Sequence, residues 1–168
     1  MLDLEYRHVD VFSRRALRGN GLVVVLNAAS LPAEVMQEVT REVRHFDTAF
    51  LTEVDLAGGS ARLRIFTEDE ELDFAGHPVV GAAAVLHTLL PVADGERAWA
   101  LTLAQRTVEA RTRSAAGWID AAMDRVSHIS ARPSPVSRHV PTATPLTWRP
   151  ASRIRPCRCR WSAPACPT

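Results

Sequence analysis

The sequence predicts an α+β domain built on a mainly antiparallel sheet. Two observations carry this prediction: strand-like segments follow one another in runs, and only two segments show helical periodicity. The second of these helices is apolar on nearly every side, so we expect the sheet to wrap round it. Hydrophobic residues make up 46% of the chain and charged residues 23%, which is typical of a soluble globular protein.

The first predicted elements are two strands and a helix. Residues 4–12 are rich in aromatic and β-branched types, which indicates a strand. A turn at residues 18–21 leads into the continuous apolar run 22–26, which is typical of a buried strand. The following helix is predicted to begin with Ser30 as its N-cap and to end near Arg44.

The second half of the domain is mostly strand. Residues 48–54 and 61–66 are predicted to pair across a glycine turn, and an acidic loop follows them. A buried helix is expected over residues 78–90. The remaining segments predicted to be extended are 72–75, 99–103, 107–113 and 117–123.

Residues 126–168 differ sharply in composition from residues 1–125. The first part holds all 19 acidic residues and 13 of the 20 basic ones, whereas the tail holds seven arginines, no acid and no glycine. The tail also holds eight of the 11 prolines and all three cysteines. Such a composition buries too little apolar surface to fold, so we predict a disordered Arg/Pro-rich tail after a folded lobe.

Codon usage offers an explanation for the tail. Every basic residue is an arginine and alanine is abundant, which indicates a coding sequence rich in G and C. Reading such a gene out of frame yields the Arg, Pro, Ser, Ala, Cys and Trp residues that characterise the tail. Our leading hypothesis is that the native frame is lost, or the chain is otherwise cut off, between about Met123 and His128. A natural basic linker is the alternative.

Several classes of protein are excluded by the same inspection. No run of 18 apolar residues is present, so we expect no transmembrane helix, and the acidic N-terminus lacks the apolar core of a secretory signal. We therefore expect a cytoplasmic protein. Cys157, Cys159 and Cys166 do not have the paired spacing of a zinc site, and we predict neither a metal nor a cofactor.

The segment Phe74-Ala75-Gly76-His77-Pro78 carries the most chemical information. We expect His77 at the N-cap of the second helix and Pro78 at its first position. The free amides of the first turn would hold an anion such as a carboxylate, and Gly81 would let a ligand approach. A histidine there can exchange a proton at neutral pH. The alternative is a helix start with a polar cap and no further role.

Asp47 and the turn Arg18-Gly19-Asn20 are the other candidates. Asp47 lies between the first helix and the next strand, where apolar neighbours would raise its proton affinity and make it a base. The alternative interpretation of Asp47 is a turn or cap residue without a catalytic role. The alternative interpretation of Arg18-Gly19-Asn20 is a tight turn without a binding role.

These segments together resemble the PhzF-like family of phenazine-biosynthesis isomerases. The resemblance runs through VDVFSRRALRGNGLVVVL (9–26), EVMQEVTREVRHFDTAFL (34–51) and ARLRIFTEDEELDFAGHPVVGAAAVL (61–86), and it disappears in the tail. It implies a fold like that of diaminopimelate epimerase: two similar α+β lobes with the active site between them. It also implies cofactor-independent proton transfer on a small carboxylate-bearing substrate.

The resemblance also assigns residues. Asp47 stands where the family has its catalytic glutamate, and His77 matches the family's active-site histidine. We therefore expect Asp47 to be the base and His77 the assisting acid–base group. The predicted substrate-binding residues are Arg18, Gly19, Asn20, Gly76, Pro78 and Gly81.

The chain departs from the family pattern in ways that bear on activity. Aspartate is one methylene shorter than glutamate, and a misplacement of about 1 Å can cost about 100-fold in rate. Phe46 replaces a small polar residue, and Gly21 stands where the family mostly has proline. Nothing in residues 126–168 resembles the second lobe, so we expect an N-terminal lobe with impaired activity that forms dimers or aggregates through its exposed interface.

Two alternatives to an isomerase remain open. The seven arginines of the tail, with Trp148 and Trp161, would suit a non-catalytic binding module whose basic arm contacts nucleic acid. The isomerase interpretation predicts no nucleic-acid partner. A third interpretation is a scaffold that borrows its second lobe from a partner chain.

Overall fold

A single sheet organises the chain. The computed structural model describes residues 3–13, 17–90, 95–115, 118–123 and 155–160, and their strands form a nine-stranded sheet in the order β8-β7-β6-β4-β3-β2-β1-β9, with β5 paired to β4. The elements in chain order are β1 (Asp3–Val11), β2 (Asn20–Val25), α1 (Ala33–Val43), β3 (Thr48–Asp55), β4 (Ser60–Phe66), β5 (Glu71–Leu72), α2 (Gly76–Thr88), β6 (Gly95–Thr102), β7 (Thr107–Ala115), β8 (Trp118–Met123) and β9 (Arg155–Arg160).

The sheet is mainly antiparallel, as the sequence predicts. The exceptions among the described strands are the β2–β3 and β4–β6 pairs, which are parallel. A helix lies between the members of each parallel pair in the chain, because parallel neighbours need a long crossover connection. Each strand and helix predicted within residues 1–125 is present in the predicted order, so the α+β prediction is confirmed at this level.

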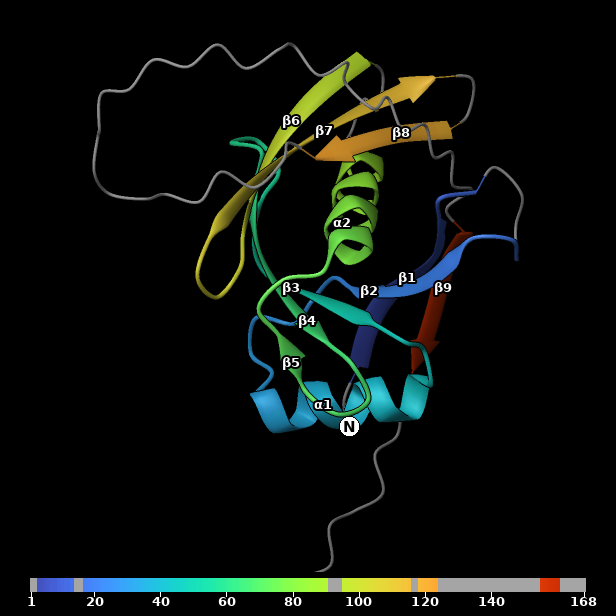
Figure 1. Ribbon diagram of the computed structural model, residues 1–168, viewed down its shortest axis with the longest axis vertical. Helices are drawn as coiled ribbons and strands as arrows, with labels where there is room; N and C mark the ends of the chain where they lie inside the picture. The colour runs from blue at the N-terminus through green and yellow to red at the C-terminus, as the bar shows by residue number, and fades with distance from the viewer. Residues whose placement is uncertain (1–2, 14–16, 91–94, 116–117, 124–154, 161–168) are drawn as a thin grey trace, which may run out of the picture.

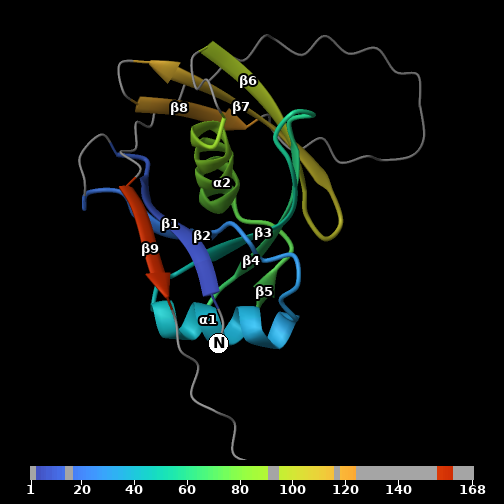
Figure 2. The same ribbon diagram turned by 180° about the vertical axis from the view of Figure 1, so that it is seen from behind.

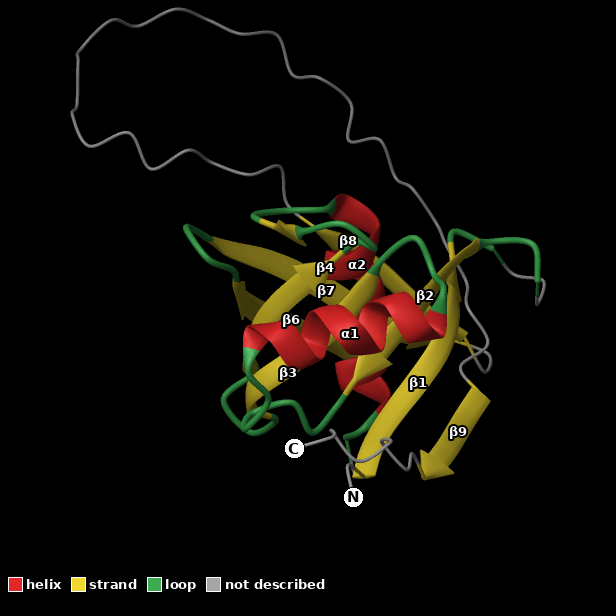
Figure 3. Cartoon of the chain, turned by 90° about the horizontal axis from the view of Figure 1, so that it is seen from below, coloured by secondary structure: helices red, strands yellow, loops and turns green. Residues whose placement is uncertain are grey.

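The two helices cover opposite faces of strands β1–β4 (Figures 1 and 3). This arrangement explains the uninterrupted apolar run Leu22–Val25 of strand β2. Leu22 and Val24 belong to the hydrophobic cluster on the α2 side, whereas Val23 and Val25 belong to the cluster on the α1 side. Because neighbouring side chains of a strand point to opposite faces, a strand covered on both faces is apolar at every position.

Helix α2 is buried along Pro78–His87 and lies between strands β6–β8 and strands β1–β3 (Figures 1 and 2). Within this buried stretch, Nδ1 of His87 lies 2.7 Å from the Thr112 hydroxyl. The Trp99 indole donates to the same hydroxyl over 2.8 Å. These contacts satisfy polar groups that burial alone would penalise.

Helix α1 begins at Ala33, with Pro32 as its N-cap, so the prediction of Ser30 as the cap is wrong. Pro32 has the extended backbone that an N-cap requires (φ −69°, ψ 158°), and no side chain caps this helix. The predicted end is confirmed: Arg44 adopts a left-handed conformation (φ 56°) and donates its amide to the Thr40 carbonyl. Only one face of α1 is buried, which includes Met36.

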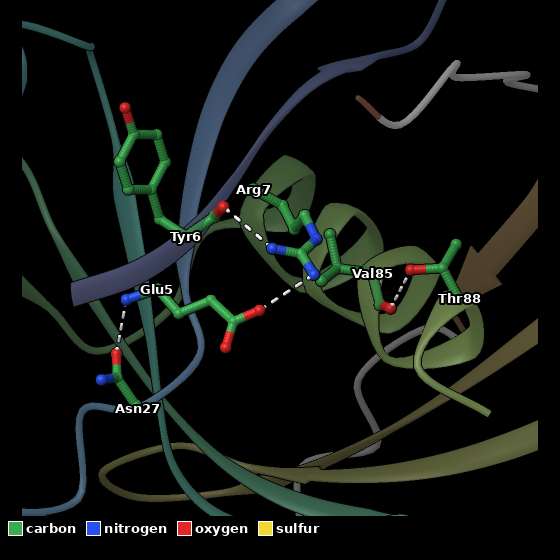
Figure 4. Close-up of polar contacts among 6 residues, drawn as sticks. All are labelled: Glu5, Tyr6, Arg7, Asn27, Val85 and Thr88. Atoms are coloured by element: carbon green, nitrogen blue, oxygen red, sulfur yellow. Dashed lines mark hydrogen bonds and ion pairs between the residues drawn. The ribbon is translucent and has the colours of Figure 1, made fainter. Parts of the chain in front are cut away.

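Polar contacts stabilise strand β1 and the end of helix α2 (Figure 4). The Glu5 amide donates to the Asn27 side chain over 2.9 Å, which ties β1 to the connection between β2 and α1. Arg7 donates to the Glu5 carboxylate over 3.1 Å and to the Tyr6 carbonyl over 3.2 Å. At the end of α2, the Thr88 hydroxyl donates to the Val85 carbonyl.

One segment of the tail differs from the predicted disorder. Residues 155–160 form strand β9, which pairs antiparallel with β1 in a register from Asp3↔Arg160 to His8↔Arg155 (Figure 3). The open edge of β1 supplies the backbone partners that this short segment needs, whatever its composition. Residues 124–154 and 161–168 lie outside the described residues, and the prediction for them stays a prediction.

Candidate functional site

Strand alternation directs Asp47 toward helix α2. Asp47 directly precedes β3, and Ala49 and Leu51 of that strand belong to the cluster on the α2 side. A residue two positions before Ala49 shares its face, so the carboxylate points to the same side of the sheet. Asp47 is only 9% exposed, which is rare for an acidic residue and requires a partner.

The start of α2 brings His77 to this carboxylate. The helix begins at Gly76 with Ala75 as an extended N-cap (φ −145°, ψ 133°), so the predicted cap position of His77 is wrong by two residues. Val79 donates the first helical bond to the Ala75 carbonyl, and Pro78 has no amide to donate. The amides of Gly76 and His77 therefore precede the first bond, as an anion site at a helix start requires.

Asp47 and His77 form a half-enclosed pair. Nδ1 of His77 lies 3.4 Å from Oδ2 of Asp47, and the two side chains are 16% and 13% exposed. This distance exceeds that of an ordinary hydrogen bond, so the two groups are coupled mainly by charge. Nε2 of His77 is buried and has no hydrogen-bond partner within the described part of the chain. Nδ1 of the imidazole thus faces the Asp47 carboxylate, and Nε2 has unused hydrogen-bonding capacity.

Burial sets the protonation of this pair. It raises the pKa of Asp47 above its ordinary value, and the nearby His77 opposes that rise. Burial lowers the pKa of His77, and the nearby Asp47 opposes that fall. Both shifts bring the two groups closer in proton affinity, because desolvation disfavours the charged form of each. Groups of similar proton affinity are suited to giving and taking protons.

Phe12 lies against His77, a contact that sequence reasoning missed. The two ring centroids are 6.3 Å apart in an edge-on arrangement, and Phe12 is 42% exposed. Its backbone is left-handed (φ 72°), which is uncommon for a bulky residue. The residue type gives no signal of such a conformation, so only the structure reveals this neighbour of the site.

The predicted substrate-binding glycines have packing roles. A Cβ on Gly81 would collide with the side chain of Leu22 and come within 2.9 Å of Val11, so glycine is needed for α2 to approach the sheet. A Cβ on Gly76 would lie 3.2 Å from the Met123 methyl group. A ligand is not required to explain either residue, and their binding role stays a prediction.

The turn Arg18-Gly19-Asn20 lies at the same end of the sheet as the pair. Asn20 pairs with Val11, and a Cβ on Gly19 would collide with the Val11 carbonyl oxygen, so this glycine lets the turn approach β1. Arg18 and Asn20 are exposed. Their approach to a substrate stays a prediction.

His8 and His45 form a second pair of side chains, which the sequence did not single out. The rings of His8 and His45 are 4.5 Å apart and tilted by 47°. A Cβ on Gly21 would lie 3.2 Å from Nδ1 of His45 and 3.4 Å from Nε2 of His8. Burial and the neighbouring His8 lower the pKa of His45, and Asp10 opposes this effect. The pair occupies space that a larger residue at position 21 would fill.

Other features of the described residues add no second site. A shallow hollow lies at the far end of β3 and β4, away from Asp47. No cluster of three or more His, Cys, Asp or Glu residues in the described ranges has an arrangement suited to a metal ion. Neither helix in this part of the chain has the length and apolarity needed to cross a membrane.

Comparisons with known proteins agree on one family. The family model described as PhzC-PhzF, phenazine biosynthesis-like protein, matches residues 9–130. An uncharacterized isomerase of Mesorhizobium japonicum is 43% identical over 84 residues, which are 50% of this chain and 28% of the relative. The trans-2,3-dihydro-3-hydroxyanthranilate isomerase of Pseudomonas fluorescens is 40% identical over 81 residues, which are 48% of this chain and 29% of the relative.

A solved structure leads to the same family. The structure of a predicted epimerase from Pseudomonas aeruginosa is similar with a TM-score of 0.67 and 45% identity, and the match covers 72% of this chain and 42% of that one. The matched part thus spans less than half of each of these three relatives. None of them supports the alternative of a nucleic-acid-binding module. Because the family model matches residues 9–130, which include Asp47, His77 and both helices, this chain belongs to the phenazine biosynthesis-like PhzC-PhzF family.

Proposed function

We propose that this chain carries the proton-transfer groups of a cofactor-independent isomerase or epimerase that acts on a small carboxylate-bearing substrate. The observation that supports it most is the buried Asp47–His77 pair, whose members lie thirty positions apart in the sequence and 3.4 Å apart in space. Family membership supports the reaction class, since the matched relatives include a named isomerase. The fold supports the proposal through the buried helix α2, which we propose is the central helix of an epimerase-type lobe.

The proposed reaction moves a proton without redox chemistry. The carboxylate of Asp47 takes a proton from a carbon of the substrate, and the electron pair left behind shifts into the conjugated carboxylate-bearing skeleton. The proton then returns to a different carbon, or to the opposite face of the same one. The raised proton affinity of Asp47 makes it a better base than an exposed aspartate, which supports this assignment.

His77 is proposed as the assisting group. Neutral imidazole has a donor and an acceptor nitrogen, and lowering of its pKa by burial favours this neutral form. Nδ1 faces Asp47, and Nε2, which is buried without a hydrogen-bond partner among the described residues, is the nitrogen proposed to exchange a proton with the substrate. The amides of Gly76 and His77 are proposed to hold the substrate carboxylate, supported by the dipole of α2.

Hydrogen exchange into a substrate tests the proposal. The full chain is incubated in D2O with trans-2,3-dihydro-3-hydroxyanthranilate, and deuterium incorporation and double-bond migration are followed by NMR. The wild type is expected to accelerate exchange, and Asp47→Asn to abolish the acceleration. His77→Asn is expected to slow exchange by about 100-fold, the usual contribution of an acid–base group. Exchange that Asp47→Asn leaves unchanged would overturn the assignment.

Asp47→Glu tests whether the short side chain limits the rate. Glutamate carries its carboxylate about 1 Å further toward the substrate, and such a gain in placement is worth up to about 100-fold. A faster Asp47→Glu variant would support the family-derived role of this position. An equally slow variant with intact binding would assign the impairment to groups outside this site.

The state of association is proposed separately. We propose that the chain forms homodimers or larger assemblies, because a single lobe of this fold leaves apolar surface to be covered. Light scattering on the purified chain measures this directly, and a monodisperse monomer would contradict it. A partner chain that contributes residues to the site would reveal itself as a rise in exchange rate upon mixing.

A further inference from the structure

Phe12 occupies an unexpected side of the sheet. In strand β1, Val9 and Val11 belong to the cluster on the α2 side, so the next residue should point to the α1 side. The Phe12 ring instead lies 6.3 Å from the ring of His77, which is at the start of α2. The left-handed backbone at Phe12 (φ 72°) breaks the alternation and turns the side chain back.

This conformation has a cost that the surroundings must offset. A bulky residue with positive φ persists only where the structure around it determines its position, and such residues gather at functional sites. The ring is also 42% exposed, so burial in the core does not account for it. One contact that the conformation provides is with the ring of His77, whose Nε2 is closed off from solvent.

We propose that Phe12 is a positioning residue for His77: its ring holds the imidazole in the orientation that directs Nδ1 to Asp47, and it keeps water away from Nε2. An imidazole without such a wall is free to rotate about its side-chain bonds, and its second nitrogen is hydrated. This inference rests on the proposed function for the role of His77, but the contact itself does not. The side chain of Phe12 has no polar atom and cannot itself exchange a proton. It therefore acts through its ring contact with His77.

Two substitutions remove the ring without straining the backbone. Glycine and asparagine both tolerate positive φ, so Phe12→Gly and Phe12→Asn are expected to fold. Phe12→Leu keeps an apolar wall and serves as the conservative variant. Phe46→Ala is the matched control, because Phe46 directly precedes Asp47 but is 93% exposed.

The titration of His77 in the full chain is the readout. The ring-proton NMR signals are followed against pH, and the His77 signal is assigned by its loss in His77→Asn. In Phe12→Gly and Phe12→Asn, the pKa of His77 is expected to rise toward its ordinary value, because water then reaches the ring. Phe12→Leu is expected to remain close to the wild type, and Phe46→Ala to match it. A His77 pKa that is the same in folded Phe12→Gly, Phe12→Asn and wild type would overturn the proposal.

This titration needs no substrate, so it distinguishes a failure of the proposed function from a failure of the positioning role of Phe12. If the His77 pKa responds to Phe12 but no variant or wild type exchanges substrate hydrogens, the proposed function fails and the contact between Phe12 and His77 stands. If exchange proceeds and its pH profile is the same with and without the ring, the positioning role fails. Where both hold, the pH profile of exchange in Phe12→Gly should shift in the same direction as the His77 titration.

Discussion

The two ends of strand β3 hold acidic residues in opposite circumstances. At the first end, Asp47 is almost buried and faces His77 across 3.4 Å. At the far end, Glu53 lies 3.6 Å from Arg62, with the two side chains 73% and 47% exposed. A hollow of about 480 Å³ lies at the far end, among residues such as Asp55 and Thr102.

The hollow and the candidate site therefore lie at different ends of β3, so a hollow alone does not identify the site. Charges at the far end interact through water, which screens them and leaves little energy in the pair. At the first end the same kind of charge has lost its water, so its proton affinity changes and its neighbours matter. Burial and unpartnered polar atoms therefore identify the candidate site, whereas the hollow lies at the other end of the strand.

The largest expected difference between the two ends is in catalysis. Asp47→Asn removes the proposed base and should reduce substrate hydrogen exchange by at least about 100-fold. Glu53→Gln, a matched carboxylate-to-amide change at the far end, should leave the rate unchanged. Exchange rates in D2O measured by NMR decide this. Equal losses in both variants would mean that the far end takes part in the reaction.

The far end is expected to matter for stability instead. Gly59 has a left-handed backbone (φ 70°), and a Cβ there would lie 2.8 Å from the Ala98 carbonyl oxygen. Gly59→Ala should therefore lower the free energy of unfolding by about 2 kcal/mol, through strain and the displaced contact with β6. Urea denaturation measures this loss.

Gly95→Ala provides the matched control for that loss. Gly95 also has positive φ (95°), but no atom of the described residues lies within 4 Å of the added Cβ. It should therefore carry the conformational strain without the collision and lose less stability than Gly59→Ala. The His77 titration should be the same in both variants and in the wild type, and a changed titration would show that the two ends of the sheet are coupled.

The sequence predicts strand β3 and the position of Asp47 at its start. It does not predict which face of the sheet α2 covers. The periodicity of residues 48–54 predicts β3, and the alternation places Asp47 on one face. Which face α2 covers depends on packing between distant segments, which no local pattern encodes. The resemblance to the PhzF-like family supplied the link between Asp47 and His77 instead.

The errors have similar causes. The backbone of Phe12 is set by tertiary contacts, since nothing in the residue type favours positive φ. The predicted starts of both helices are wrong because Ser30 is a favoured cap type and Pro78 is typical of a first helical position, whereas Pro32 and Ala75 have the extended backbone that the cap position needs. The packing role of Gly81 could not be predicted from the sequence, because the collision of an added Cβ with Leu22 is a long-range contact, and its binding role stays a prediction.

A smaller effect is expected on the pH dependence of stability. The pKa of His77 is lowered in the folded state, so between that lowered value and 6.5 the unfolded chain binds more protons. The free energy of unfolding should therefore rise with pH across this window. Asp47 acts with the opposite sign, since its raised pKa makes stability fall as pH rises from 3.8 to the raised value.

His77→Asn tests the first of these contributions. Denaturation at a series of pH values should show a shallower rise below pH 6.5 in the variant than in the wild type. His45, whose pKa burial also lowers, keeps its own share in both proteins, so some rise should remain. Identical profiles for the two proteins would mean that His77 titrates alike in the folded and unfolded chain.

The smallest expected effect belongs to the exposed ion pair at the far end. Exposed pairs are worth about 0.2–1 kcal/mol, because water screens the charges and two long side chains must be held in place. A double-mutant cycle on Glu53→Gln and Arg62→Gln should therefore give a coupling free energy below about 0.5 kcal/mol, which shrinks further in high salt. A larger, salt-insensitive coupling would mean that the hollow holds these charges away from solvent. The far end of β3 would then be a candidate ligand site as well.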